Sequence, residues 1–73
     1  MQQNRLNKLN YLMVFVKKFA DKFDLSEKQA FNYLDTHKGF VFVDKHYDVI
    51  HTLDFSYAID DVQEVCRTYG GGL

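Results

Sequence analysis

The 73-residue sequence contains no proline, a single cysteine and four glycines, three of which stand together near the C-terminus. The absence of proline is compatible with helices throughout, since proline breaks a helix more strongly than any other residue. The single cysteine, Cys66, cannot form an intramolecular disulfide and indicates a reducing compartment. We therefore expect a cytoplasmic protein whose stability does not depend on a disulfide.

Long apolar runs, an export signal and excess charge are also missing. The longest apolar run, residues 11–16, is far shorter than the roughly 20 residues of a membrane span. The first four residues carry no cationic head before an apolar stretch, so we expect no secretion and no membrane association. The net charge of −1 gives no overall attraction to nucleic acid, although residues 1–38 carry 7 basic and 4 acidic groups and residues 39–73 carry 2 and 6.

One long helix is predicted from residue 4 to about residue 23. Apolar residues recur there at spacings of three and four over five turns, which is the pattern of a helix with one buried face. The residues expected to face the core are Leu6, Leu9, Met13, Val16, Ala20 and Phe23.

The middle of this helix is apolar nearly all round, because Tyr11, Val14 and Phe15 lie outside the predicted inner stripe. Three short helices can hardly enclose a fourth in so short a chain. We therefore expect Tyr11 and Phe15 to form an uncovered aromatic face that contacts a partner or a second copy.

A second helix is predicted from Glu27 to about His37. Ser26 and Gln29 have the spacing of a capping box, in which each side chain satisfies a free backbone N–H of the first turn. Gly39 is expected to end this helix, because glycine accepts the left-handed conformation. The side chains expected to be buried are Ala30, Phe31 and Leu34.

Residues 40–43, Phe-Val-Phe-Val, are β-branched and aromatic and are compatible with a strand or a helix. Phe40, Val43, Tyr47 and Ile50 follow a helical period, and a lone strand would find no partner elsewhere in the chain. We therefore favour a helix, with a strand as the alternative.

A last helix is predicted to begin between Phe55 and Ala58 and to end before Gly70. The expected inner stripe is Ile59, Val62, Cys66 and Tyr69, with Val65 beside it. The predicted fold is all-α, a small bundle of four helices with short loops. Residues 1–69 form the single domain, and residues 70–73 form a flexible glycine-rich tail.

The run Tyr-Asp-Val-Ile-His-Thr at residues 47–52 resembles a family of short bacterial proteins, domain-of-unknown-function family 3791. An aromatic-rich first helix, Gly39 and the Asp61-Val62 pair extend the resemblance to nearly the whole chain. This sequence has Leu53-Asp54 where the family commonly has glycine. The resemblance implies a bacterial cytosolic protein without an assigned activity, often encoded beside proteins resembling ADP-ribosyltransferase toxins, and hence an antitoxin-like or accessory role.

Residues that could carry chemistry are few. Asp44, Asp48 and His51 would share one helix face and could hold a divalent metal weakly, although such a face is usually only solvated. Cys66 lies on an inner stripe, away from the exposed setting that a nucleophilic thiol needs. No Cys or His pair has zinc spacing, and no glycine-rich phosphate loop lies inside the chain. We expect no catalytic activity, no metal, no cofactor and no small-molecule substrate.

The expected function is therefore non-catalytic protein binding, to a partner protein or to a second copy through the first helix. One alternative is a DNA-binding regulator, since the first half is basic, but the chain has only two arginines and its second helix carries acids. The other is a weak metal-dependent enzyme using the acidic and histidine face. The candidate partner contacts are Tyr11, Phe15, Asp48, His51 and Asp61.

Overall fold

The structure is a computed structural model that describes the backbone of residues 2–72 and the side chains of residues 7–72. Within that range it contains helices and no strands, so the predicted all-α fold is confirmed. The predicted third helix is divided at His46, whose φ of −112° and ψ of 20° leave the helical region. The helices are α1 (Gln2–Lys22), α2 (Glu27–Thr36), α3 (Gly39–Lys45), α4 (Tyr47–Ile50) and α5 (Phe55–Thr68).

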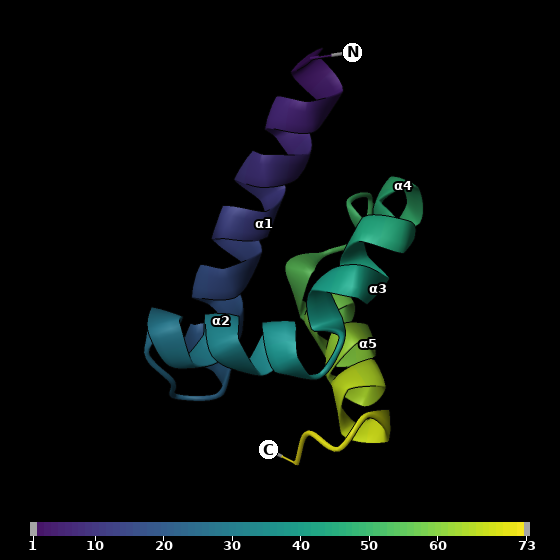
Figure 1. Cartoon of the computed structure of the whole chain (residues 1–73). Coiled ribbons are helices and arrows are strands. Elements are labelled where there is room, and N and C mark those ends of the chain that lie inside the picture. The colour runs from purple at the N-terminus through teal and green to yellow at the C-terminus, as the bar shows by residue number, and fades with distance from the viewer. Residues whose placement is uncertain (1, 73) are drawn as a thin grey trace.

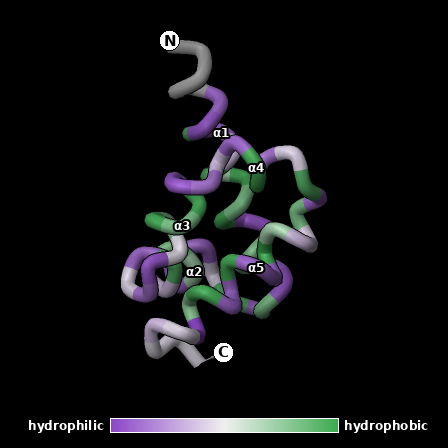
Figure 2. Tube along the Cα trace, turned by 90° about the vertical axis from the view of Figure 1, so that its right-hand side faces the viewer, coloured by the Kyte–Doolittle hydropathy of each residue, from purple (hydrophilic) through white to green (hydrophobic). Residues whose placement is uncertain are grey.

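The path of the chain is simple (Figure 1). α1 descends along one side, α2 crosses its lower end, α3 and α4 rise on the other side, and α5 returns to the bottom. Contacts join α1 to α2 and α5, and α3 to α2, α4 and α5. The N-terminal turns of α1 extend past the other helices. Hydrophobic and hydrophilic residues alternate along the helices, as their amphipathic sequences predict (Figure 2).

The core lies between α1, α2, α3 and α5. Its two largest side chains are Phe15 and Phe19 of α1, which have no exposed surface and whose ring centroids lie 6.1 Å apart. The buried apolar residues are Phe15, Val16, Phe19, Ala20, Ala30, Leu34, Val43, Ile50, Ala58, Ile59, Val62 and Cys66.

The N-terminal half of α1 buries a different face from the predicted one. Phe15 is fully buried, and Tyr11 is half-buried against Phe55 with ring centroids 5.0 Å apart. Met13 and Leu9, which we expected in the core, are 69% and 51% exposed. The prediction of an uncovered face at Tyr11 and Phe15 is therefore wrong. Aromatic rings remove more apolar area from water than Leu or Met, which favours burial of the aromatic face.

Farther along α1 the prediction is confirmed, since Val16 and Ala20 are buried and Phe23 is half-buried. The side chain of Leu6 lies outside the described residues.

The capping box predicted at the start of α2 is confirmed. Ser26 Oγ accepts a hydrogen bond from the backbone N–H of Gln29 at 3.0 Å, and Gln29 Oε1 accepts one from the N–H of Ser26 at 2.9 Å. Ala30 and Leu34 are buried as predicted, but Phe31 is 51% exposed.

The turn after α2 differs from the prediction. Lys38, not Gly39, takes the left-handed conformation with φ of 67°, and Gly39 begins α3. Residues 40–43 are helical, so the helix reading is confirmed and the strand alternative is wrong. Gly39 is buried, which places α3 close against its neighbours.

The last helix buries Ile59, Val62 and Cys66 as predicted, whereas Tyr69 is 54% exposed. Its end is closed by Gly70, with φ of 88°, and by a hydrogen bond of 2.8 Å from the N–H of Gly71 to the carbonyl of Cys66. The hydroxyl of Tyr33 donates to the carbonyl of Gly71 at 2.8 Å. Gly71, which we assigned to the flexible tail, is therefore attached to the domain.

Candidate functional site

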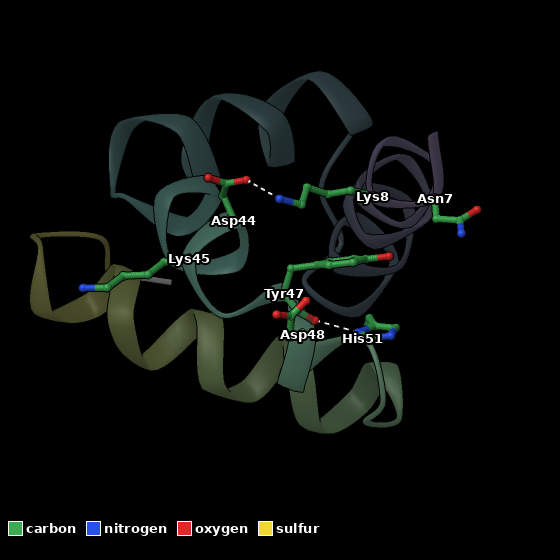
Figure 3. Close-up of a pocket in the computed structure, with 7 residues that line it drawn as sticks. All are labelled: Asn7, Lys8, Asp44, Lys45, Tyr47, Asp48 and His51. Carbon is green, nitrogen blue, oxygen red and sulfur yellow. Dashed lines mark hydrogen bonds and ion pairs between the residues drawn. The ribbon is translucent and has the colours of Figure 1, made fainter. Parts of the chain in front are cut away.

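A polar pocket lies where α1 faces α3 and α4 (Figure 3). It includes three members of the 47–52 run that carries the family resemblance. Lys45 and Asn7 point away from its centre, while Lys8 reaches across from α1 toward Asp44. The residues that line it are Asn7, Lys8, Asp44, Lys45, Tyr47, Asp48 and His51.

Lys8 connects α1 to the other side of this pocket. Its ammonium group forms an ion pair of 2.9 Å with Asp44 of α3 and lies 5.4 Å from the centroid of the Tyr47 ring. Tyr47 in turn packs edge-on against Tyr11, with centroids 5.6 Å apart. The half-buried Tyr47 therefore serves as packing between α1 and α4. Burial, and then the neighbouring Tyr47, raise the pKa of the Tyr11 hydroxyl above its ordinary value.

His51 is held by the residue one helical turn before it. Its Nδ1 lies 2.7 Å from the carbonyl oxygen of Tyr47, and the two rings stack with centroids 4.6 Å apart. Because a carbonyl only accepts a hydrogen bond, Nδ1 is the donor in this contact and carries a proton. The hydroxyl of Thr52 donates to the carbonyl of Val49 at 2.7 Å, and together these bonds end α4.

Asp48 and His51 are exposed, as predicted, and Thr52 follows the end of α4. They do not combine with Asp44 into a metal site. Asp44 is engaged by Lys8, and among the side chains of residues 7–72 no three His, Cys, Asp or Glu groups are placed to hold a metal ion. Asp61 is exposed on α5 and lines neither this pocket nor the hollow between α1 and α2.

A second hollow, which we call the α1–α2 groove, lies between α1 and α2 and reaches the start of α3. Phe31 forms its wall on α2. The ring of Phe31 packs against that of Phe40 on α3, with ring centroids 4.9 Å apart. Its other wall is the face of α1 that we expected in the core. The apolar lining consists of Leu9, Leu12, Met13, Val14, Val16, Phe31 and Phe40.

The groove exposes large apolar side chains to solvent: Met13 is 69% exposed, and Leu9 and Phe31 are each 51% exposed. Charged residues stand at its edges, Lys17 on α1 and Glu27 and Lys28 on α2. An apolar centre with a charged rim is the usual composition of a protein-binding surface.

The sequence contained a signal for this groove, because the middle of α1 is apolar nearly all round. That signal predicted an uncovered apolar face on α1, and such a face exists. It did not identify the residues, which are Leu9 and Met13 and not Tyr11 and Phe15.

Cys66 has the setting expected of a core residue. It has no exposed surface, and burial raises the pKa of its thiol to about 11. The thiol is therefore protonated at neutral pH.

None of the helices in the described part of the chain is long and apolar enough to cross a lipid bilayer. Comparison with the curated proteins and with the solved structures gives no match. A family model, described as "Protein of unknown function (DUF3791)", matches residues 10–69, a span that contains α2 to α5, the 47–52 run and most of the groove. The chain therefore belongs to the DUF3791 family.

Proposed function

We propose that this domain works by binding another protein through the α1–α2 groove. The observation that supports the proposal is the continuous exposure of Leu9, Met13 and Phe31 in one hollow of a 73-residue domain. Single exposed apolar residues are common on soluble proteins, but a contiguous apolar hollow with a charged rim is typical of an interaction site. Covering these side chains would remove apolar area from water and so favour association.

Charge favours a different protein over a second copy as the occupant. α1 carries five basic residues, Arg5, Lys8, Lys17, Lys18 and Lys22, and one acidic residue, Asp21. At the edges of the groove itself, Lys17 and Lys28 outnumber Glu27. Two copies that covered their grooves against each other would bring four lysines together with two glutamates, and like charges left opposite each other destabilise such an interface.

The same cations give little support to DNA binding. Lys8 is paired with Asp44, Lys22 is paired with Asp60, and Lys18 lies 5.4 Å from the centroid of the Phe55 ring. Contacts with phosphates need cations in a row facing the nucleic acid, whereas the hollow beside α1 is apolar. Protein binding is therefore the better supported of the two functions.

The family resemblance gives this function a more specific form. Within the proposal, the domain is an antitoxin-like or accessory protein that acts on a co-encoded partner. We also assign it to the cytoplasm, because its single thiol is unpaired and buried in the core. Neither assignment is needed for the groove to bind a protein.

The test compares polar substitutions inside and outside the groove. Met13→Gln combined with Phe31→Gln makes the groove polar without adding charge. Val49→Gln combined with Tyr57→Gln is the matched control, since Val49 and Tyr57 are each 64% exposed and do not line the groove. Circular dichroism should show both variants folded, because all four side chains are exposed.

Each variant and the wild type would then be immobilised and exposed to an extract of the native host. We expect proteins that are retained by the wild type and the control, at equal abundance by mass spectrometry, but lost with the groove variant. The identity of the retained protein would be established by testing its purified form for the same dependence. If no retained protein depends on Met13 and Phe31, the proposal is wrong.

A further inference from the structure

We infer that the α1–α2 groove receives an amphipathic helix of the partner, with its apolar stripe flanked by acidic residues. This inference rests on the proposed function and names the chemistry of the segment that fills the same groove.

The length of the groove along α1 fits one face of a helix. Leu9, Met13 and Val16 line it at spacings of four and three along α1. They therefore span two helical turns, or about 10 Å. An amphipathic helix presents its own apolar anchors at positions i, i+3 or i+4, and i+7, which is the same length. Phe31 on α2 faces this row from the other wall, so that an inserted side chain would be enclosed on two sides.

The backbone around the groove also favours a helical occupant. An extended peptide binds most readily by adding a strand to an exposed sheet edge. Residues 2–72 contain no strand, and the walls of the groove are formed by α1, α2 and α3. Backbone groups inside helices are already paired, so the walls would offer no hydrogen-bond partners to the N–H and C=O groups of an extended segment, which would depend on water. A helix satisfies its backbone internally and needs only side-chain contacts.

The rim determines the charge of that helix. Lys17 on α1 and Lys28 on α2 are exposed at the edges of the groove. The ion pairs among the described side chains use Lys8 and Lys22, so the ammonium groups of Lys17 and Lys28 have no acidic partner there. Among the side chains of residues 7–72, Glu27 is the only acidic one in the lining. A helix lying between the two lysines would pair with both if acidic residues flanked its apolar stripe.

The inference can be tested with two synthetic peptides of about 15 residues, a length at which an isolated helix becomes marginally stable. Both carry the same stripe of Leu and Ile at helical spacing, one with Glu and the other with Lys at the flanking positions. Fluorescence anisotropy would measure the binding of each labelled peptide to the whole chain at low and high salt.

We expect the Glu-flanked peptide to bind several-fold to about tenfold tighter than the Lys-flanked one, as two exposed ion pairs permit. Added salt should reduce this ratio. Lys17→Glu combined with Lys28→Glu should reverse the preference. Met13→Gln combined with Phe31→Gln should weaken both peptides. Circular dichroism of each variant provides the control for folding.

The outcomes separate this inference from the proposed function. Equal binding of the two peptides would show that the groove does not select acidic residues beside the apolar stripe, and would overturn that part of the inference. Binding that is unaffected by Met13→Gln and Phe31→Gln would overturn the groove as the site of the helix. If neither peptide binds while capture of a host protein still depends on Met13 and Phe31, the occupant is not helical and only the inference fails. Concentration-dependent dimerisation in light scattering that Met13→Gln abolishes would assign the groove to a second copy, against both proposals.

Discussion

A Cβ atom added to Gly39 would lie 2.7 Å from Cδ2 of Leu34, closer than two carbon atoms can approach without moving one of them. The same atom would lie 3.1 Å from Sγ of Cys66 on α5. Leu34 and Cys66 have no exposed surface, so neither can turn away into solvent. Gly39 is therefore required at the start of α3 for close packing against α2 and α5, and not for an unusual backbone conformation.

Gly39→Ala should consequently destabilise the domain by about 1–2 kcal/mol, because overpacking a filled core outweighs the better helix propensity of alanine. The free energy of unfolding would be measured by urea denaturation. Gly72→Ala is the control, since a Cβ there meets nothing within 4 Å, and it should change stability by less than about 0.5 kcal/mol. Equal stabilities of the two variants would show that α3 can move away from Leu34.

The two faces of α1 should respond very differently to truncation. Phe15→Ala removes a fully buried ring and should cost about 3–5 kcal/mol, whereas Met13→Ala on the exposed face should cost less than about 1 kcal/mol. Thermal unfolding followed by circular dichroism compares the two variants directly. A Met13→Ala variant that loses as much stability as Phe15→Ala would mean that the core includes the groove face.

His51→Ala should change the free energy of unfolding by less than about 1 kcal/mol. The substitution removes one exposed hydrogen bond, to the Tyr47 carbonyl, and one exposed ring stack. Thr52→Val is a useful comparison because it removes the neighbouring bond to the Val49 carbonyl while keeping the shape of the side chain. Loss of several kcal/mol with His51→Ala would give His51 a structural role and remove it from the candidate partner contacts.

Burial of Cys66 should make the domain less stable in alkali. Its pKa is raised in the folded state from an ordinary 9 to about 11, so the unfolded chain loses this proton at lower pH than the folded one. The protonated thiol therefore contributes its full stabilisation of the folded state below pH 9. As the pH rises to about 11 this contribution is lost, and the free energy of unfolding falls by roughly 2–3 kcal/mol.

Urea denaturation from pH 8 to pH 11 under reducing conditions would measure this loss. Cys66→Ala should show a shallower decrease than the wild type. It keeps the burial of Tyr11 and Tyr33, whose pKa values are also raised. Because Cys66 adds to the rise of the Tyr33 pKa, the difference between the two curves reports the thiol together with its effect on Tyr33. If the free energy of unfolding fell equally with pH in the wild type and in Cys66→Ala, the loss of stability in alkali would not come from the Cys66 thiol.

The features that could be predicted from sequence are those that depend on neighbours in the chain. The capping box of Ser26 and Gln29 is a matter of residues three apart. The helical period of Phe40, Val43 and Ile50 identified a helix despite the β-branched composition of residues 40–43. The exposure of Asp48 and His51 followed from the same period, because a helical register fixes which side chains point away from the core.

The buried face of α1 could not be derived in the same way. Two apolar stripes share this helix, one through Leu9 and Met13 and one through Tyr11 and Phe15. Helical spacing accepts both, and the choice depends on which stripe packs better against α5, where Phe55 stacks on Tyr11. The groove could not be derived either, because its second wall depends on where α2 crosses α1.

α1 is covered by other helices along only part of its length. Its N-terminal turns extend past the rest of the fold, and Leu9 and Asn10 are exposed, whereas Phe15 and Phe19 are fully enclosed. The free energy for local opening of a helical turn depends on the tertiary contacts that it loses. Amide hydrogens should therefore exchange with solvent quickly in the first turns of α1, from residue 2 to about residue 10, and slowly around Phe15 and Phe19. A partner lying over Leu9 and Met13 would slow exchange in the turns of α1 that carry these two residues, and would thereby move the start of the slowly exchanging part of the helix toward its N-terminus.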